Sequence, residues 1–149
     1  MECLRDETPA DRLYRKGLAI RYERHGGLWM PIMWRLALRG HTGAMIELAD
    51  WFSYDNSAKA FGTPADAFSP AGLYHRAHRK GDARAAYNAA MSCFNRNDMA
   101  GYRRWLRRAT NAGDADAGTR LRYFETRLWH SAARKVGRLR PEQKRDKFA

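Results

Sequence analysis

The stretch DMAGYRRWLRRATNAGDADAGTRLRYF, residues 98–124, indicates the fold of this chain. Trp105 and Ala109 are four residues apart, so that in an α-helix they lie on one face. Gly113 ends this helix, because glycine adopts the left-handed C′ conformation without the steric penalty of a Cβ atom. Asp114 follows as an N-cap residue, and we expect the next helix to begin directly after it. The stretch therefore predicts two helices joined by a corner of one glycine.

The same spacing recurs around two earlier glycines, Gly40 and Gly81, which makes the pattern an internal repeat. A small or apolar residue stands four before, four after and eight after each of the three glycines. In that order the residues are Leu36, Ala44 and Leu48; Ala77, Ala85 and Ala89; and Ala109, Ala117 and Leu121. The glycines are 41 and 32 residues apart, a length typical of stacked helical hairpins. Alanine suits these positions because the two helices of a tight corner approach closely.

The rest of the chain extends this pattern to an all-α protein. The expected helices are Ala10–Arg24, Leu28–Arg39, one opened by His41 or Thr42, Pro70–Lys80, Ala83–Asn95, Met99–Ala112, and Ala115 to about Arg138. Turn-forming residues make 53–70 a loop, in which Phe61 and Phe68 are expected to pack on the body. We predict a right-handed α-solenoid of about three helix-turn-helix repeats with N- and C-terminal capping helices. It forms one domain over 1–149, with 1–9 and 141–149 flexible.

The repeated pattern W-x-x-x-A-x-x-x-G-[HDN]-x-x-A-x-x-x-L resembles the Sel-one-like repeat (SLR), a relative of the tetratricopeptide repeat, over about Pro31–Phe124. The third unit matches at Trp105, Ala109, Gly113, Asp114, Ala117 and Leu121, with Asp98 at the head of its first helix. The second unit matches at Asp66, Leu73, Ala77, Gly81, Asp82 and Ala85, and departs at Ala89. The first unit matches at Gly40, His41, Ala44 and Leu48, with Leu36 in place of the alanine.

This resemblance implies a non-catalytic adaptor or scaffold that binds a protein or peptide. The partner would lie on the concave face, which the first helix of each repeat lines. An acidic partner suits the positive charge of the chain. The candidate residues of this face are Trp34, Arg35, Tyr74, His75, Arg76, Tyr102, Arg104 and Arg108.

The charge of the chain leaves a second function open. Lys and Arg number 28 against 16 Asp and Glu, a net charge of +12 that attracts polyanions and acidic proteins alike. Over residues 98–149 there are fourteen basic and six acidic residues. The alternative is therefore an RNA- or DNA-binding module that uses this basic C-terminal third. Its candidate polyanion contacts are Arg103, Arg107, Arg134, Lys135 and Arg138.

No pattern in the sequence indicates catalysis, a metal or a cofactor. His75 and His78 share a helix face, but their basic neighbours Arg76, Arg79 and Lys80 repel a cation, so we interpret both as solvated. Cys93 has no His and Asp or Asn pattern around it and is interpreted as a buried residue. With two cysteines, no secretory signal and no long apolar run, we expect a cytoplasmic protein away from the membrane, monomeric or dimeric.

Overall fold

The computed structural model describes residues 7–54 and 58–127, and these are helical or in short connections. They contain no strand, so the prediction of an all-α protein is confirmed for the described part. Within that part, no helix is both long enough and apolar enough to cross a lipid bilayer. The helices are α1 (Pro9–Tyr22), α2 (Trp29–Leu38), α3 (Thr42–Phe52), α4 (Ala58–Phe61), α5 (Pro70–Arg79), α6 (Ala83–Asn95), α7 (Met99–Asn111) and α8 (Ala115–Arg127).

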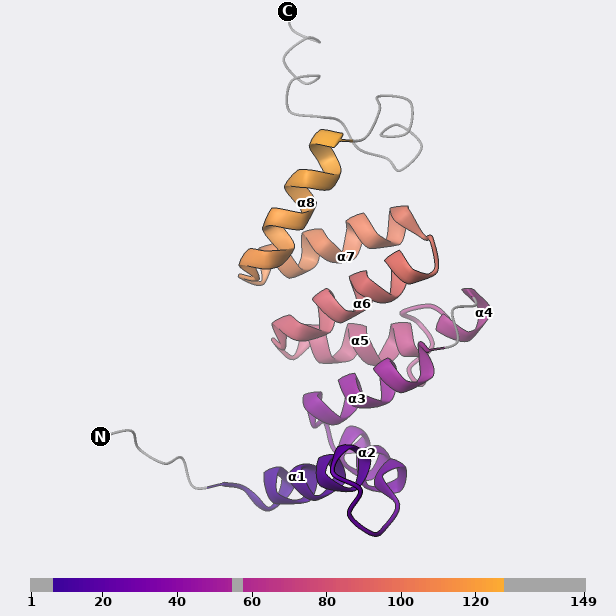
Figure 1. Cartoon of the computed structure of the whole chain (residues 1–149), viewed down its shortest axis with the longest axis vertical. Helices are drawn as coiled ribbons and strands as arrows, with labels where there is room; N and C mark the ends of the chain where they lie inside the picture. Colours follow the sequence, from indigo (N-terminus) through magenta and orange to yellow (C-terminus); the bar gives the residue numbers. More distant parts are fainter. Residues whose placement is uncertain (1–6, 55–57, 128–149) are drawn as a thin grey trace, which may run out of the picture.

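The helices follow one another along the long axis of the molecule (Figure 1). Helices α1 and α2 lie at one end, and α8 lies at the other. Each long helix packs mainly on the helices next to it in the chain, except that α3 packs on α5, across the short α4, and also touches α6. The core is therefore continuous along the stack rather than gathered at one centre.

The corners between helices follow the predicted glycines. Gly40, Gly81 and Gly113 have φ angles of +92°, +94° and +98°, in the left-handed region. The corner before α7 uses Asn97 instead, with φ 60°, which asparagine tolerates better than most residues. The N-cap that follows each corner is also as expected: the side chains of His41, Asp82, Asp98 and Asp114 each accept a hydrogen bond from a backbone N–H of the following helix.

The connection between α3 and α5 differs from its prediction in two respects. It contains the short helix α4, whose Phe61 is buried as expected. Phe68 is 58% exposed, although its ring still lies 6.0 Å from that of Trp34. The N-cap of α5 is Ser69, whose hydroxyl accepts from the N–H of Gly72. The predicted extension of the last helix beyond Arg127 falls outside the described residues.

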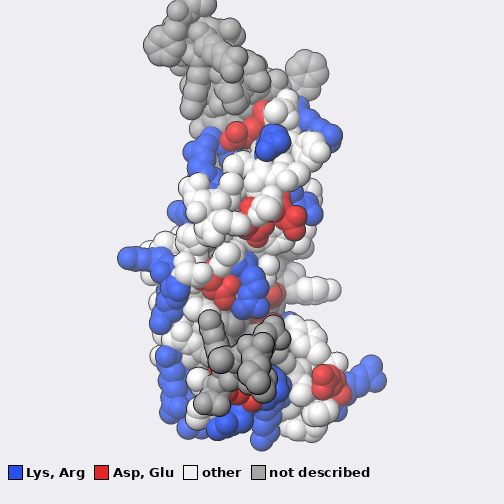
Figure 2. All heavy atoms as spheres, turned by 90° about the vertical axis from the view of Figure 1, so that its left-hand side faces the viewer, with Lys and Arg blue, Asp and Glu red and all other residues white. Residues whose placement is uncertain are grey.

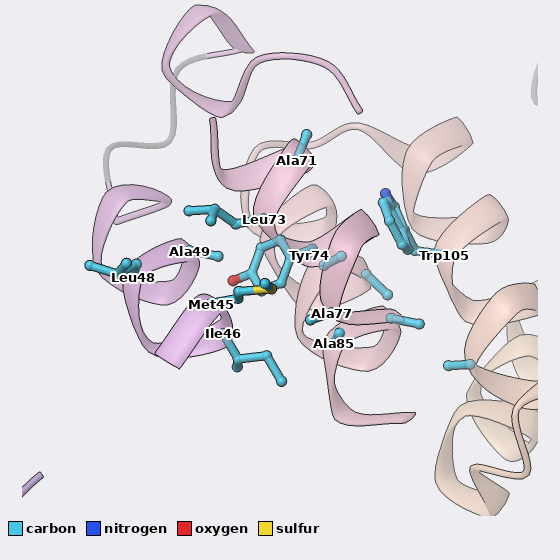
Figure 3. Packing of buried hydrophobic residues seen from close by; sticks show 14 of the residues in the cluster. Met45, Ile46, Leu48, Ala49, Ala71, Leu73, Tyr74, Ala77, Ala85 and Trp105 are labelled. Carbon is cyan, nitrogen blue, oxygen red and sulfur yellow. The ribbon is translucent and has the colours of Figure 1, made fainter. Parts of the chain in front are cut away.

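The alanines of the repeat pattern lie in the core. Ala44, Ala77, Ala85, Ala89, Ala109 and Ala117 are all completely buried. Figure 3 shows the ring of Tyr74 among them, with its hydroxyl directed towards α3 and Trp105 on the α7 side of the cluster. Because such interiors are close-packed, one added methylene at an alanine would push helices apart.

Candidate functional site

Four of the helices, α2, α5, α6 and α7, carry arginine and no carboxylate, and α6 contributes one arginine, Arg84. Helix α2 has one arginine, α5 has two and α7 has four. Helices α1, α3 and α8 each contain acidic residues. Figure 2 shows the result on one face of the molecule, where Lys and Arg gather along a long edge and Asp and Glu lie nearer its middle. We call α2, α5, α6 and α7 the acid-free helices. Of these, α2, α5 and α7 are the first helices of the three predicted repeats, and α6 is the second helix of the middle repeat.

A pocket of about 390 Å³ lies between α7, the start of α5 and the segment that follows α4. We call it the arginine pocket. Its cationic lining is Arg96, Arg104 and Arg108. The remaining lining residues are Phe61, Gly62, Thr63, Pro64, Ala71, Cys93, Asp98, Gly101 and Trp105, most of them apolar or small.

Two of the three arginines are held in place by aromatic rings. The guanidinium of Arg96 lies 3.6 Å from the ring centroid of Phe61 and donates to Sγ of Cys93 and to the carbonyl of Ser92, both at 3.3 Å. The guanidinium of Arg108 lies 4.6 Å from the ring centroid of Trp105. Stacking of this kind fixes the cation without neutralising it.

The positive charge of the pocket is largely uncompensated. None of its three arginines forms an ion pair with a carboxylate of the described residues. Asp98 is the one acidic residue in the lining, and its Oδ1 accepts a hydrogen bond of 2.9 Å from the N–H of Gly101, as the N-cap of α7. The pocket therefore combines three guanidinium groups with one carboxylate that already has a structural role.

Two histidines of α5 lie against the same tryptophan. The ring centroids of His75 and His78 are 6.5 and 6.2 Å from that of Trp105, in edge contacts. Burial lowers the pKa of both imidazoles, and the charge of Arg108 lowers each pKa further, with Arg79 adding to the effect on His75. Nδ1 of each is buried without a hydrogen-bond partner in the described part of the chain. The pKa of each histidine is therefore lowered in part by the positive charge of nearby arginines.

The structure brings together three of the predicted partner-binding residues and separates the others. His75, Arg104 and Arg108 gather around Trp105, and Arg76 is half-buried on α5. Trp34 lies farther along the stack, in a pocket of about 500 Å³ that Phe52 and Phe68 also line. Arg35 lies beside Arg39 and His41, in another pocket of about 370 Å³.

Two of the predicted partner-binding residues are core residues instead. Tyr74 is completely buried, and its hydroxyl donates to Asp50, so this side chain does not face a groove. Tyr102 is 6% exposed, with its ring 5.3 Å from that of Phe94 and 5.4 Å from that of Phe124. Tyr74 lies on the side of α5 that meets α3 of the preceding hairpin. Tyr102 lies between α6 and α8, where it also lines a pocket of about 370 Å³.

The predicted polyanion-binding row on α7 is divided by Glu125 of α8. Arg103 is buried, with its Nε 3.3 Å from Oε1 of Glu125. Arg107 is exposed, and its Nη2 lies 3.7 Å from the same carboxylate oxygen. Half of the four-arginine row thus faces α8 rather than the arginine pocket. Arg134, Lys135 and Arg138 lie outside the described residues.

Sequence reasoning missed Arg96, Phe61 and Asp50. The first two meet in the arginine pocket because Phe61, at the end of α4, lies under Arg96, the residue that follows α6, a contact between distant segments that has no local pattern. Asp50 had a usable signal, since it is one of two carboxylates, with Glu47, in the otherwise apolar segment 44–52. A half-buried acid needs a donor, and Tyr74 and Asn88 provide it.

Comparison with known proteins identifies no function, so a functional proposal rests on the geometry of the structure. No protein-family model matches the chain, and no curated protein or solved structure matches it either. Within residues 7–54 and 58–127, no group of three or more His, Cys, Asp or Glu side chains is placed to hold a metal ion.

Proposed function

We propose that this chain is a short, right-handed α-solenoid of about three SLR-like repeats, and that it acts as a non-catalytic adaptor for an acidic protein or peptide segment. Three features support the solenoid. Successive helices pack in chain order, the corner glycines have left-handed φ angles, and the alanines at fixed offsets from them are buried. Stacked hairpins of this kind offer a long surface made by equivalent helices.

The arginine pocket on the acid-free helices is the observation that favours an acidic partner. Charged side chains are usually arranged so that a partner presents the opposite sign. Here α2, α5 and α7 supply cations and no anion. An acidic polypeptide segment would supply the missing carboxylates.

A polypeptide fits these features better than a nucleic acid. Binding to a phosphate backbone uses a row of exposed cations that follows the strand. On α7 that row is divided, because Arg103 is buried and both Arg103 and Arg107 face Glu125. What remains is a pocket with apolar walls, which suits individual side chains.

Selection from a library of random displayed peptides, with the full chain as bait at physiological salt, tests the proposal. We expect the selected sequences to be enriched in Asp and Glu next to apolar residues. A single-stranded oligonucleotide should bind weakly, with a log–log salt slope near −3 if about four phosphates are contacted. Selection of no peptide, together with submicromolar oligonucleotide binding at the same salt, would contradict the adaptor and support a nucleic-acid-binding module.

A further inference from the structure

We infer that the arginine pocket is a receptor for one acidic side chain of the partner, whose carboxylate binds Arg104 and Arg108 while an adjacent apolar side chain lies against Pro64. This inference rests on the proposed function, and it names the anchoring subsite and the chemistry of the segment that binds there.

The charges around the pocket favour a monovalent anion over a dianion. Arg104 is exposed and Arg108 is half-buried, and neither pairs with a carboxylate in the described residues. A guanidinium group donates to a carboxylate through two parallel N–H groups, an interaction stronger than that between neutral partners. Asp98 also lines the pocket, and its negative charge opposes a dianionic phosphate more than it opposes a carboxylate.

The volume and lining of the pocket favour a ligand that is larger than one carboxylate. About 390 Å³ lies within the range of pockets that hold small organic ligands, and exceeds what one carboxylate fills. Pro64 supplies exposed apolar surface next to the arginines, and the buried side chains of Phe61, Ala71 and Trp105 form the floor behind it. An acidic residue with a leucine-like neighbour would use both parts of the lining.

The pocket is also partly preorganised. Arg96 is fixed on Phe61 and by its two hydrogen bonds, and Arg108 is fixed on Trp105. Side chains that are already ordered lose less conformational entropy when a ligand binds. Surface arginines such as Arg35 and Arg39, which lie in another pocket, make no comparable aromatic contact in the described residues.

Fluorescence anisotropy of a labelled octapeptide of alternating Glu and Leu tests the inference. The double variant Arg104→Gln, Arg108→Gln should bind this peptide at least about tenfold more weakly than the wild type. The matched control Arg12→Gln, Arg15→Gln on α1 removes the same charge outside the pocket and should change the dissociation constant by less than about threefold. The single variant Arg104→Gln, at an exposed position, should give an intermediate loss without disturbing the stacking of Arg108.

The outcomes separate this inference from the proposed function. Equal losses in the pocket and control variants would overturn the pocket and leave a diffuse acidic-peptide surface. Failure of the octapeptide to bind the wild type would also overturn the pocket, while the library selection still decides the adaptor. A Gln and Leu octapeptide that binds as well as the Glu and Leu one would show that charge is not recognised, and this too would contradict the pocket.

The two histidines supply an independent readout. Burial is the main cause of the lowered pKa of His75 and His78, and the charge of Arg108 lowers it further. A carboxylate beside Arg108 offsets this second contribution, so that peptide binding should raise the pKa of both. Imidazole NMR titrations with and without the octapeptide measure this change, with the exposed His25 as internal control. Unchanged pKa values of His75 and His78 in the saturated complex would place the carboxylate elsewhere.

Discussion

The hydroxyl of Tyr74 on α5 donates a hydrogen bond of 2.5 Å to Oδ1 of Asp50 on α3. Asn88 of α6 donates to both oxygens of the same carboxylate, at 3.3 and 3.2 Å, so one half-buried acid joins three helices. Burial raises the pKa of Asp50, whereas the hydrogen bond from Tyr74 lowers it. Burial and the charge of Asp50 together raise the pKa of Tyr74. This contact fixes how the first and second hairpins meet.

Replacing Tyr74 by Phe should lower the free energy of unfolding by about 1–3 kcal/mol, because Asp50 then loses a donor in a half-buried site. The folded pKa of Asp50 is already above its unfolded value and should rise further in the variant. Since stability from a raised pKa is present at low pH and lost as pH rises through the folded pKa, the loss should be larger at pH 7 than at pH 4. Urea unfolding at both pH values measures it. Tyr54→Phe, at a side chain 89% exposed, is the control, and equal losses in the two variants would contradict this role.

Gly113→Val should lower the free energy of unfolding by about 1–2 kcal/mol or more through backbone strain alone. A Cβ atom at Gly113 would meet nothing within 4 Å, so that the φ angle of +98° is the only obstacle. Gly113→Asn should cost less, since Asn97 already occupies the left-handed region at the corner before α7. Gly26→Val, at an open position without a left-handed φ, should change little. Equal melting temperatures for the two valine variants would contradict the corner geometry.

Arg103→Gln should destabilise the protein by about 1–3 kcal/mol, whereas Arg107→Gln should change its stability by less than about 0.5 kcal/mol. Both arginines face Glu125, but the side chain of Arg103 is 9% exposed and that of Arg107 is 53% exposed. Removing the buried cation leaves the carboxylate without its closer partner. Thermal unfolding of the two single variants compares the same change of charge on one helix. A larger loss for Arg107→Gln would mean that α8 packs differently.

The stability of the fold should decrease as pH falls below about 6.5, the ordinary pKa of histidine. His75 and His78 have folded pKa values below that of the unfolded chain, so their contribution is present above about 6.5 and is lost as pH falls through the folded pKa. The double variant His75→Gln, His78→Gln should flatten this part of the profile. Melting temperatures between pH 5 and 8 test it, and an equally steep profile in the variant would assign the effect to other groups.

The local features of the fold could be predicted because they depend on neighbours in the chain. Helix α6 has the predicted bounds Ala83–Asn95, and the glycine corners and the caps at Asp82 and Asp98 lie where their residue types indicate. Each of these depends on backbone conformation or on hydrogen bonds across three or four residues. Such interactions leave a readable pattern in one sequence.

The orientation of side chains between helices could not be read in the same way. The i, i+4 pattern of α7 does not tell which arginines face α8. That orientation depends on the contact with Glu125, 22 residues beyond Arg103. A helical wheel does not show that Tyr74 is buried, because its hydroxyl donates to Asp50, 24 residues earlier in the chain. The arginine pocket needs Phe61 to fold back onto Arg96. These contacts depend on tertiary packing, which overrides the local pattern.

Amide chemical-shift mapping of the full chain with the Glu and Leu octapeptide tests the central claim most directly. If the acid-free helices bind the partner through the arginine pocket, the largest shifts at saturation will fall on Gly62, Arg96, Gly101, Arg104 and Arg108, with smaller ones along α5. The amides of α1 and the exposed face of α8 should move little. Shifts concentrated on α8 instead, or spread evenly over every exposed arginine, would contradict the account.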